Sequence, residues 1–399
     1  MRASDCTGAM TADAAEHRSP RPSTILVVGV VALAVAIGIG RFAFTPLLPL
    51  MVRDHAIDAA TGSEWAAANY AGYLVGALTA ARMGRRMLPS LRAAMVGVAL
   101  ATMLVAFIQG AVLGATLRFA AGVFSAWVLV LASSWCLAEL ARCGEARAGS
   151  WVYTGVGIGI ALSGAVAWLG GMQAAWLLWL ELGLLAALGA AYVLAALPRS
   201  SAGLRVAGVM TRRPALHEGR TLVICYAAFG FGYIVPATFL PALAREQIDN
   251  PLVFGITWPL FGLAAALSVA VVARALSAAP RRRVWAVAQA TMAVGTGLPV
   301  LSQSLWALAL SALLVGGTFM ITTMAGLQLA RELMPRDPTP LLARMTAAFA
   351  AGQIAGPVLV RSLQLQPATG AGAVTAASAV AALALALTAL WLWRGKTSA

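Results

Sequence analysis

The residues that could do chemistry in this sequence are a few charged side chains inside long apolar segments. Arg41, Arg118 and Arg361 fall within such segments, and Glu181 is the one acidic residue clearly inside one. A charge at the centre of a membrane costs roughly 2.5–3.5 kcal/mol even on a lenient insertion scale, so each is expected to face a cavity, a partner or the interface. Three guanidinium groups against one carboxylate favour an anionic ligand, because guanidinium binds carboxylate through two parallel hydrogen bonds.

Two of these charges also have a structural interpretation. Arg361 lies close enough to the end of its segment for its long side chain to reach the interface. Glu181 follows Trp176 and Trp179, which are typical of an interfacial aromatic belt. Arg41 and Arg118 are therefore the stronger candidates for binding or proton coupling.

Neutral hydrogen-bonding groups accompany these charges. Tyr226, Tyr233 and Thr238 share one apolar segment and would form walls of a binding cavity, although such groups also serve to join helices. The other neutral candidates within apolar segments are Tyr70, Tyr73, Gln289, Gln328 and Gln353.

Glycines and prolines are predicted to interrupt two of the apolar segments. A proline removes a backbone hydrogen bond, and in lipid the freed carbonyl must be satisfied by protein or by water in a cavity. Paired interruptions therefore predict hinges beside a transport site, with bent structural helices as the alternative. The predicted hinge residues are Gly38, Gly40, Pro46, Pro49, Gly230, Gly232, Pro236 and Pro241.

The sequence gives no sign of an enzyme. No nucleophile, base and orienting group recur at a defensible spacing, and there is no Gly-x-x-x-x-Gly-Lys phosphate loop. The four cysteines lack CxxC spacing and the three histidines are scattered, so we expect no metal and no cofactor.

The composition is that of a membrane protein. Of the 399 residues, 61% are hydrophobic and 11% are charged, whereas a soluble domain carries roughly a quarter charged residues. The net charge of +14 does not indicate nucleic-acid binding, because the basic residues occupy the breaks between apolar segments, where they act as topology signals.

The apolar segments predict an all-α protein of about twelve transmembrane helices. A spanning helix needs about 20 apolar residues, and six segments fall in residues 24–197 and six in 221–393. The remainder is predicted to be a disordered tail at 1–23, a linker at 198–220 and a second tail at 394–399, all cytoplasmic.

Basic residues alternate from one loop to the next. With the N-terminus inside, the outer loops hold only Arg53 and Arg245. Cytoplasmic loops collect Lys and Arg, so both termini are expected in the cytoplasm of a bacterial cell, with the chain in its inner membrane. The inner loops include Arg85, Arg212, Arg282 and Arg336.

An internal repeat relates the first and seventh segments. Gly38-Ile39-Gly40-Arg41, Pro49 and Arg53-Asp54 align without a gap on Gly230-Phe231-Gly232-Tyr233, Pro241 and Arg245-Glu246, 192 positions later. Both copies run from inside to outside, which predicts two parallel six-helix halves.

The sequence resembles the YbfB/YjiJ branch of the major facilitator superfamily. The motifs that carry this resemblance are GIGRFAFTPLLP at 38–49, NYAGYL at 69–74, FGFGY at 229–233 with ATFLP at 237–241, and GQIAGP at 352–357. Arg118 followed four residues later by Gly122 also matches the superfamily's fourth-helix pattern. The loop after the second segment departs from the superfamily pattern, because its acidic residue is absent between Gly76 and Arg86.

The resemblance implies the major-facilitator fold, alternating access and proton coupling. Together with the residues, it predicts a secondary active transporter of a small organic solute, anionic or amphiphilic, with the lipid bilayer, that solute and protons as its partners. We expect a monomer that binds no nucleic acid. The alternatives are a drug or metabolite efflux carrier, and a transporter-like membrane sensor that does not transport.

Overall fold

The computed structural model describes residues 20–108, 110–198, 216–245, 256–302, 304–335, 337–364 and 372–395. Side chains are described for these residues except 59, 216–218, 239–245 and 364. The predicted tails up to residue 19 and from 396, and the predicted linker from 199 to 215, lie outside the described residues, so the proposed division into tails, linker and halves stays a prediction there.

All regular structure in the described residues is helical. The N-terminal half contains α1 (Pro22–Leu33), the π-helix η1 (Ala34–Ile39), α2 (Phe44–Arg53), α3 (Ala59–Met83), η2 (Gly84–Arg86), α4 (Met87–Leu104), η3 (Val105–Phe107), α5 (Ala111–Arg142), η4 (Ala146–Tyr153), α6 (Thr154–Leu169) and α7 (Ala175–Ala196). The C-terminal half contains α8 (Leu216–Arg245), α10 (Thr257–Ala275), α11 (Arg281–Leu301), α12 (Leu305–Leu333), α13 (Thr339–Gln364) and α14 (Ala373–Arg394).

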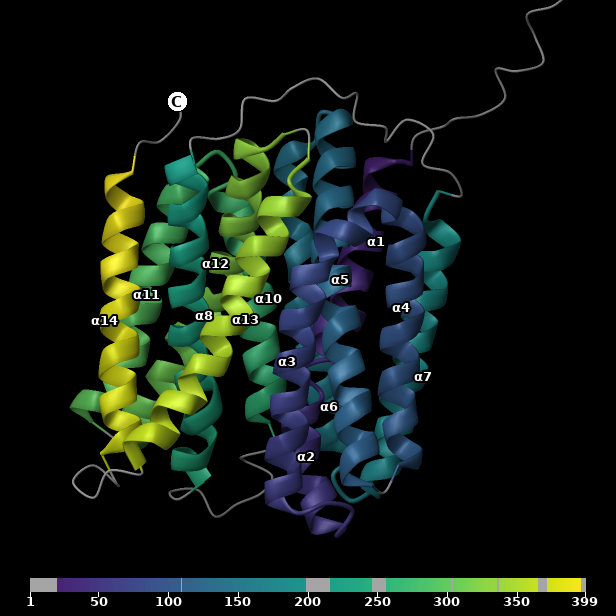
Figure 1. Cartoon of the computed structure of the whole chain (residues 1–399), viewed down its shortest axis with the longest axis vertical. Coiled ribbons are helices and arrows are strands. Elements are labelled where there is room, and N and C mark those ends of the chain that lie inside the picture. The colour runs from purple at the N-terminus through teal and green to yellow at the C-terminus, as the bar shows by residue number, and fades with distance from the viewer. Residues whose placement is uncertain are drawn as a thin grey trace, which may run out of the picture.

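The long helices form a bundle of two halves (Figure 1). In the view shown, α1 to α7 lie on one side, and α8, α11, α12 and α14 lie on the other. The halves meet where α6 packs against α10 and α13 packs against α3. The start of α1 and the end of α14 lie at the same end of the bundle, here called the terminal end.

The chain crosses the bundle twelve times over the described residues. By length and composition, ten segments qualify as membrane spans, and one of them, 60–107, holds both α3 and α4. The helix α13 is not among the ten, although its 26 residues are long enough to cross. The predicted all-α fold of about twelve transmembrane helices in two parallel halves is confirmed.

The first span is broken in its middle, as its glycines and prolines predict. The α-helix gives way to the π-helix Ala34–Ile39, a turn follows, and α2 restarts at Phe44. Pro46 falls in the first turn of α2, where its missing N–H costs no intrahelical bond.

The matching interruption predicted in the seventh span is wrong. In the described structure α8 continues as one helix from Leu216 to Arg245, past Gly230, Gly232, Pro236 and Pro241.

Candidate functional site

The broken first span is held by side chains of α5. Ser125 Oγ donates to Ala36 O at 2.7 Å, and Arg118 donates from Nη1 to Gly40 O at 3.0 Å and from Nη2 to Arg41 O at 3.1 Å. Arg118 is only 1% exposed. These donors satisfy carbonyls at the break, which a membrane protein cannot leave bare in lipid.

Arg41 projects from this turn into the contact between the two halves. It is 6% exposed, and its Nη2 donates to the side-chain oxygen of Gln353 in α13, which is itself 1% exposed. Its Cζ lies 3.9 Å from the ring centroid of Tyr73 and 5.6 Å from that of Tyr70, both in α3. The guanidinium thus has a neutral amide and aromatic faces as neighbours, and its buried Nε has no hydrogen-bond partner.

Neither Arg41 nor Arg118 forms an ion pair within the described part of the chain. The ion pairs found there are Arg53–Asp54, Arg142–Glu139 and Arg281–Glu332. Two buried positive charges therefore lie close together without a carboxylate partner, which is an unfavourable arrangement that a bound anion would relieve.

Aromatic rings from both halves line up beside Arg41. Phe42 lies 6.3 Å from Phe319 and 6.4 Å from Trp258, centroid to centroid. Tyr233 of α8 stacks on Phe319 at 5.0 Å, and the Arg41 Cζ lies 5.7 Å from the centroid of Phe42. These five residues place a cation next to an extended apolar surface.

The other predicted binding residues lie apart from this cluster. Tyr226 is buried against Phe229 and Trp285, with centroids 5.3 and 5.8 Å away. Thr238 and Arg361 are exposed on α8 and α13, and Glu181 is partly buried on α7. The structure records no contact between any of these four residues and Arg41 or Arg118. Of the predicted residues, it gathers the neutral candidates Tyr70, Tyr73 and Gln353 around Arg41. Arg118 binds the same turn, and Tyr233 joins the cluster through Phe319.

The predicted hinge glycines are sites of tight helix packing. A Cβ on Gly38 would lie 2.4 Å from Gly159 Cα, and one on Gly230 would lie 2.2 Å from Phe349 O. Gly40 and Gly232 instead face side chains of α4 and α14. Their role as hinges stays a prediction.

Sequence reasoning did not single out two residues that build the site. Gln353 was one of several neutral groups, and its pairing with Arg41 spans 312 positions in the chain. Ser125 was missed, although it lies seven residues after Arg118 and hence on the same face of the helix. Among the described residues there is no group of three or more His, Cys, Asp and Glu that could hold a metal ion.

Comparison with known proteins identifies the family. The sequence profile of the MFS_4 family, described as "Uncharacterised MFS-type transporter YbfB", matches residues 33–392. No curated protein matches by sequence.

Solved structures share the fold. The human organic anion transporter MFSD10 (TETRAN) has a TM-score of 0.72 and 17% identity, covering 94% of this chain and 100% of its own. A D-xylose-proton symporter gives 0.69 and 15%, covering 94% and 97%, and a mutant of the nucleoside transporter NupG gives 0.64 and 14%, covering 93% and 99%. Since the family profile covers most of the sequence, this chain belongs to the MFS_4 family of the major facilitator superfamily.

Proposed function

We propose that this membrane transporter carries an amphiphilic organic anion, bound between its halves with its negative group on Arg41. The observation that carries this proposal is the Arg41 guanidinium, buried at the contact between α3 and α13 with a neutral amide as its polar partner. A carboxylate would supply the missing countercharge through two hydrogen bonds. The rings of Phe42, Tyr233 and Phe319 would contact its apolar body.

The support for this ligand class comes from the geometry of the site, whereas the similar solved structures share the fold alone. One similar structure is described as an organic anion transporter, but 17% identity extends the likeness only to the fold. The aromatic surface beside Arg41 also fits the efflux of amphiphilic metabolites, which is the second candidate function.

We place the terminal end in the cytoplasm of a bacterial cell, with the chain in the inner membrane. Most described arginines outside the bundle's middle gather at that end, among them Arg85, Arg92, Arg282 and Arg394, whereas Arg53, Arg245 and Arg361 lie toward the opposite end. Short cytoplasmic loops collect basic residues, which supports this orientation.

We also propose that the anion moves together with a proton. In uptake, an anion carried inward alone moves against the membrane potential at a cost of about 2.3 kcal/mol per charge at 100 mV, and a proton carried with it cancels this cost. In proteoliposomes, adding to the external solution an anion that the protein binds should then raise the external pH, because each anion takes up a proton with it. Uptake without any pH change would contradict proton coupling.

Ligand-induced thermal stabilisation of the purified protein tests the charge preference. An aryl carboxylate, its primary amide and the matching amine form a panel that varies only the charged group. The carboxylate should raise the melting temperature most, because selective binding stabilises the folded state by mass action. Arg41→Gln should weaken its affinity by roughly ten- to a hundredfold, the value of a charge-assisted hydrogen bond.

Two further variants make this result specific. Arg41→Lys should be nearly as damaging as Arg41→Gln, because an ammonium keeps the charge and loses the forked geometry. Arg361→Gln removes an exposed arginine from α13 and should bind like the parent. The proposal fails if the amine is the best ligand or if Arg41→Gln binds the carboxylate unchanged.

A further inference from the structure

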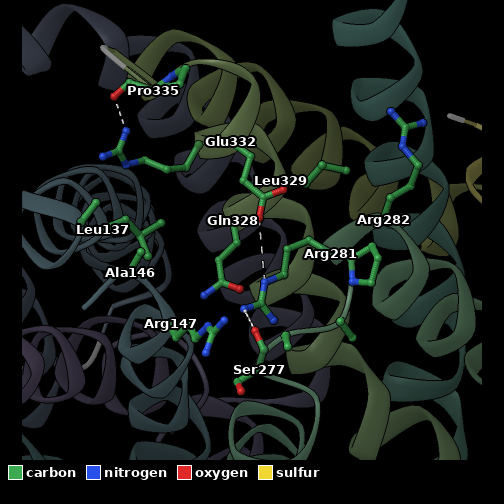
Figure 2. A pocket seen from close by; sticks show the side chains of 15 residues that line it. Leu137, Ala146, Arg147, Ser277, Arg281, Arg282, Gln328, Leu329, Glu332 and Pro335 are labelled. Atoms are coloured by element: carbon green, nitrogen blue, oxygen red, sulfur yellow. Dashed lines mark hydrogen bonds and ion pairs between the residues drawn. The ribbon is translucent and has the colours of Figure 1, made fainter. Parts of the chain in front are cut away.

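A cavity lies at the terminal end, between residues of both halves. It has a volume of about 620 Å³, within the range of small-molecule sites. Its lining comes from the end of α5, the start of η4, the segment that joins α10 to α11, the start of α11, and the end of α12 (Figure 2). None of the residues assigned above to the Arg41 site lines it.

Arg281 supplies a buried donor to this cavity. The residue is 7% exposed, and its Nη2 donates to Ser277 O at 2.9 Å. Its Nε lies 4.0 Å from a carboxylate oxygen of Glu332, a residue at the mouth whose side chain is 52% exposed. The Nη1 atom is buried and has no hydrogen-bond partner. A buried N–H without an acceptor is costly, and a ligand oxygen would remove that cost.

The charges around Arg281 are mostly of the same sign. Arg147 of the other half points toward it in Figure 2 and is close enough to repel it. Arg331 also lines the cavity, with its Nη1 donating to Pro335 O and its buried Nε unpaired. Arg282 points away from the centre. Glu332 is the single acidic residue among the lining residues, so the cavity has an excess of positive charge.

We propose that this cavity binds a phosphate group, held between Arg147 and Arg281. A phosphate offers several acceptor oxygens and up to two negative charges, and guanidinium groups match its geometry. The group could belong to a free phosphate compound or to the headgroup of an anionic phospholipid, since both present the same chemistry. The site is separate from the Arg41 site and does not depend on the ligand proposed there.

Binding here would also affect the relation between the halves. Arg147 belongs to η4 and Arg281 to α11, so one anion would neutralise a repulsion across the boundary between them. The same boundary is bridged nearby by Gln328, whose Nε2 donates to Ser150 Oγ at 3.0 Å. A ligand that binds better when the halves are close shifts the population toward the state that is closed at the terminal end.

The test uses pyrophosphate as a soluble probe and calorimetry of the full chain in phosphatidylcholine nanodiscs. The parent should bind pyrophosphate, and Arg147→Gln and Arg281→Gln should each weaken binding about tenfold. Arg147 is exposed, so its replacement leaves the packing intact even if Arg281→Gln folds poorly. Arg274→Gln removes an exposed arginine from the end of α10, outside the cavity, and should bind like the parent.

A second arm identifies the source of the phosphate. In nanodiscs that contain phosphatidylglycerol, weaker pyrophosphate binding by the parent supports a lipid headgroup as the occupant, and unchanged binding supports a soluble one. The proposal is overturned if the parent does not bind pyrophosphate and also retains no more phosphatidylglycerol during purification than the Arg147→Gln variant does. It is also overturned if Arg274→Gln is as impaired as Arg147→Gln, or if Arg41→Gln abolishes pyrophosphate binding, because the ligand would then occupy the other site.

Discussion

Two buried arginines of similar environment have different tasks in this protein. Arg118 donates hydrogen bonds from both Nη groups to backbone carbonyls of the first span, at Gly40 and Arg41. Arg41 points to the other half and retains an unpaired Nε. The sequence marks both arginines as candidates for binding or proton coupling, and their hydrogen bonds distinguish the two. Arg118 positions the turn, and Arg41 is the group that can meet a ligand.

Replacing Arg118 tests this positioning role. Arg118→Gln should lower the stability of the protein by about 1–3 kcal/mol, because a shorter side chain leaves buried carbonyls without donors. Ligand affinity should fall as well, since the turn that carries Arg41 is no longer fixed. Arg118→Lys should be intermediate in stability, because an ammonium can reach one carbonyl but does not match the fork.

Thermal unfolding in detergent and ligand titration measure both effects. Arg361→Gln, which removes an exposed arginine, is the matched control and should leave both unchanged. An Arg118→Gln protein with the parent's melting temperature and affinity would show that the observed hydrogen bonds to the turn do not matter.

The burial of Arg41 and Arg118 was predictable, whereas their partners were not. An arginine within an apolar segment must find a cavity or a partner, because bare burial is too costly. The partner Gln353 lies on a helix of the other half, and one sequence does not reveal which of several buried amides will meet Arg41. The exposure of Thr238 and Arg361 depends on the rotation of their helices, which the uniformly apolar segments leave undetermined.

At the scale of the elements, one pair of repeated glycines has the same physical role in both halves, which is close helix packing. Gly38 and Gly230 occupy equivalent positions, and each allows its helix to touch the backbone of a later helix of the same half, α6 or α13. The first span breaks and α8 does not. At the same offset of 192 positions, the donors Arg118 and Ser125 correspond to Leu310 and Gly317, which have no side-chain donor for a freed carbonyl.

Adding a methyl group tests the glycine contacts. Gly38→Ala and Gly230→Ala should each destabilise the protein by about 1–3 kcal/mol, because the new Cβ collides with backbone that cannot move aside easily. Gly317→Ala is the control: nothing lies within 4 Å of its added Cβ, so this helix position should gain roughly 0.5–1 kcal/mol. Melting temperatures in detergent compare all three. Equal melting temperatures for Gly38→Ala and Gly317→Ala would contradict the packing explanation.

At the scale of the whole molecule, the number of crossings followed from apolar segments and basic loops together. The eleventh crossing, α13, is not among the ten segments whose length and composition fit a membrane span. The alternation of basic loops nevertheless required a span there. How the halves meet did not follow from the sequence. At the terminal end they are joined by Ser150 with Gln328, and by Thr339 Oγ1 with Ser134 Oγ at 3.3 Å, and all four residues are buried.

These contacts predict from which side of the membrane a buried residue becomes accessible to solvent during transport. If the halves open alternately to the two sides, the Ser134–Thr339 contact must break whenever the terminal end opens. In the orientation proposed above, Ser134 is then exposed to the cytoplasm. In a background without the native cysteines, Ser134→Cys should therefore react with a membrane-impermeant maleimide in inside-out vesicles, slowly, because the open state is populated for part of the time. In right-side-out vesicles it should stay unreacted.

Two exposed positions calibrate this accessibility experiment. Arg85→Cys, at the terminal end, should react rapidly in inside-out vesicles, and Asp58→Cys, in the loop between α2 and α3, should react rapidly in right-side-out vesicles. A ligand that holds the halves in the state described here should slow the reaction of Ser134→Cys and leave Arg85→Cys unaffected, because only the former depends on opening. Reversed labelling of Arg85→Cys and Asp58→Cys would contradict the orientation. Correct labelling of both, with Ser134→Cys inert from either side, would instead show that the halves do not separate at this contact.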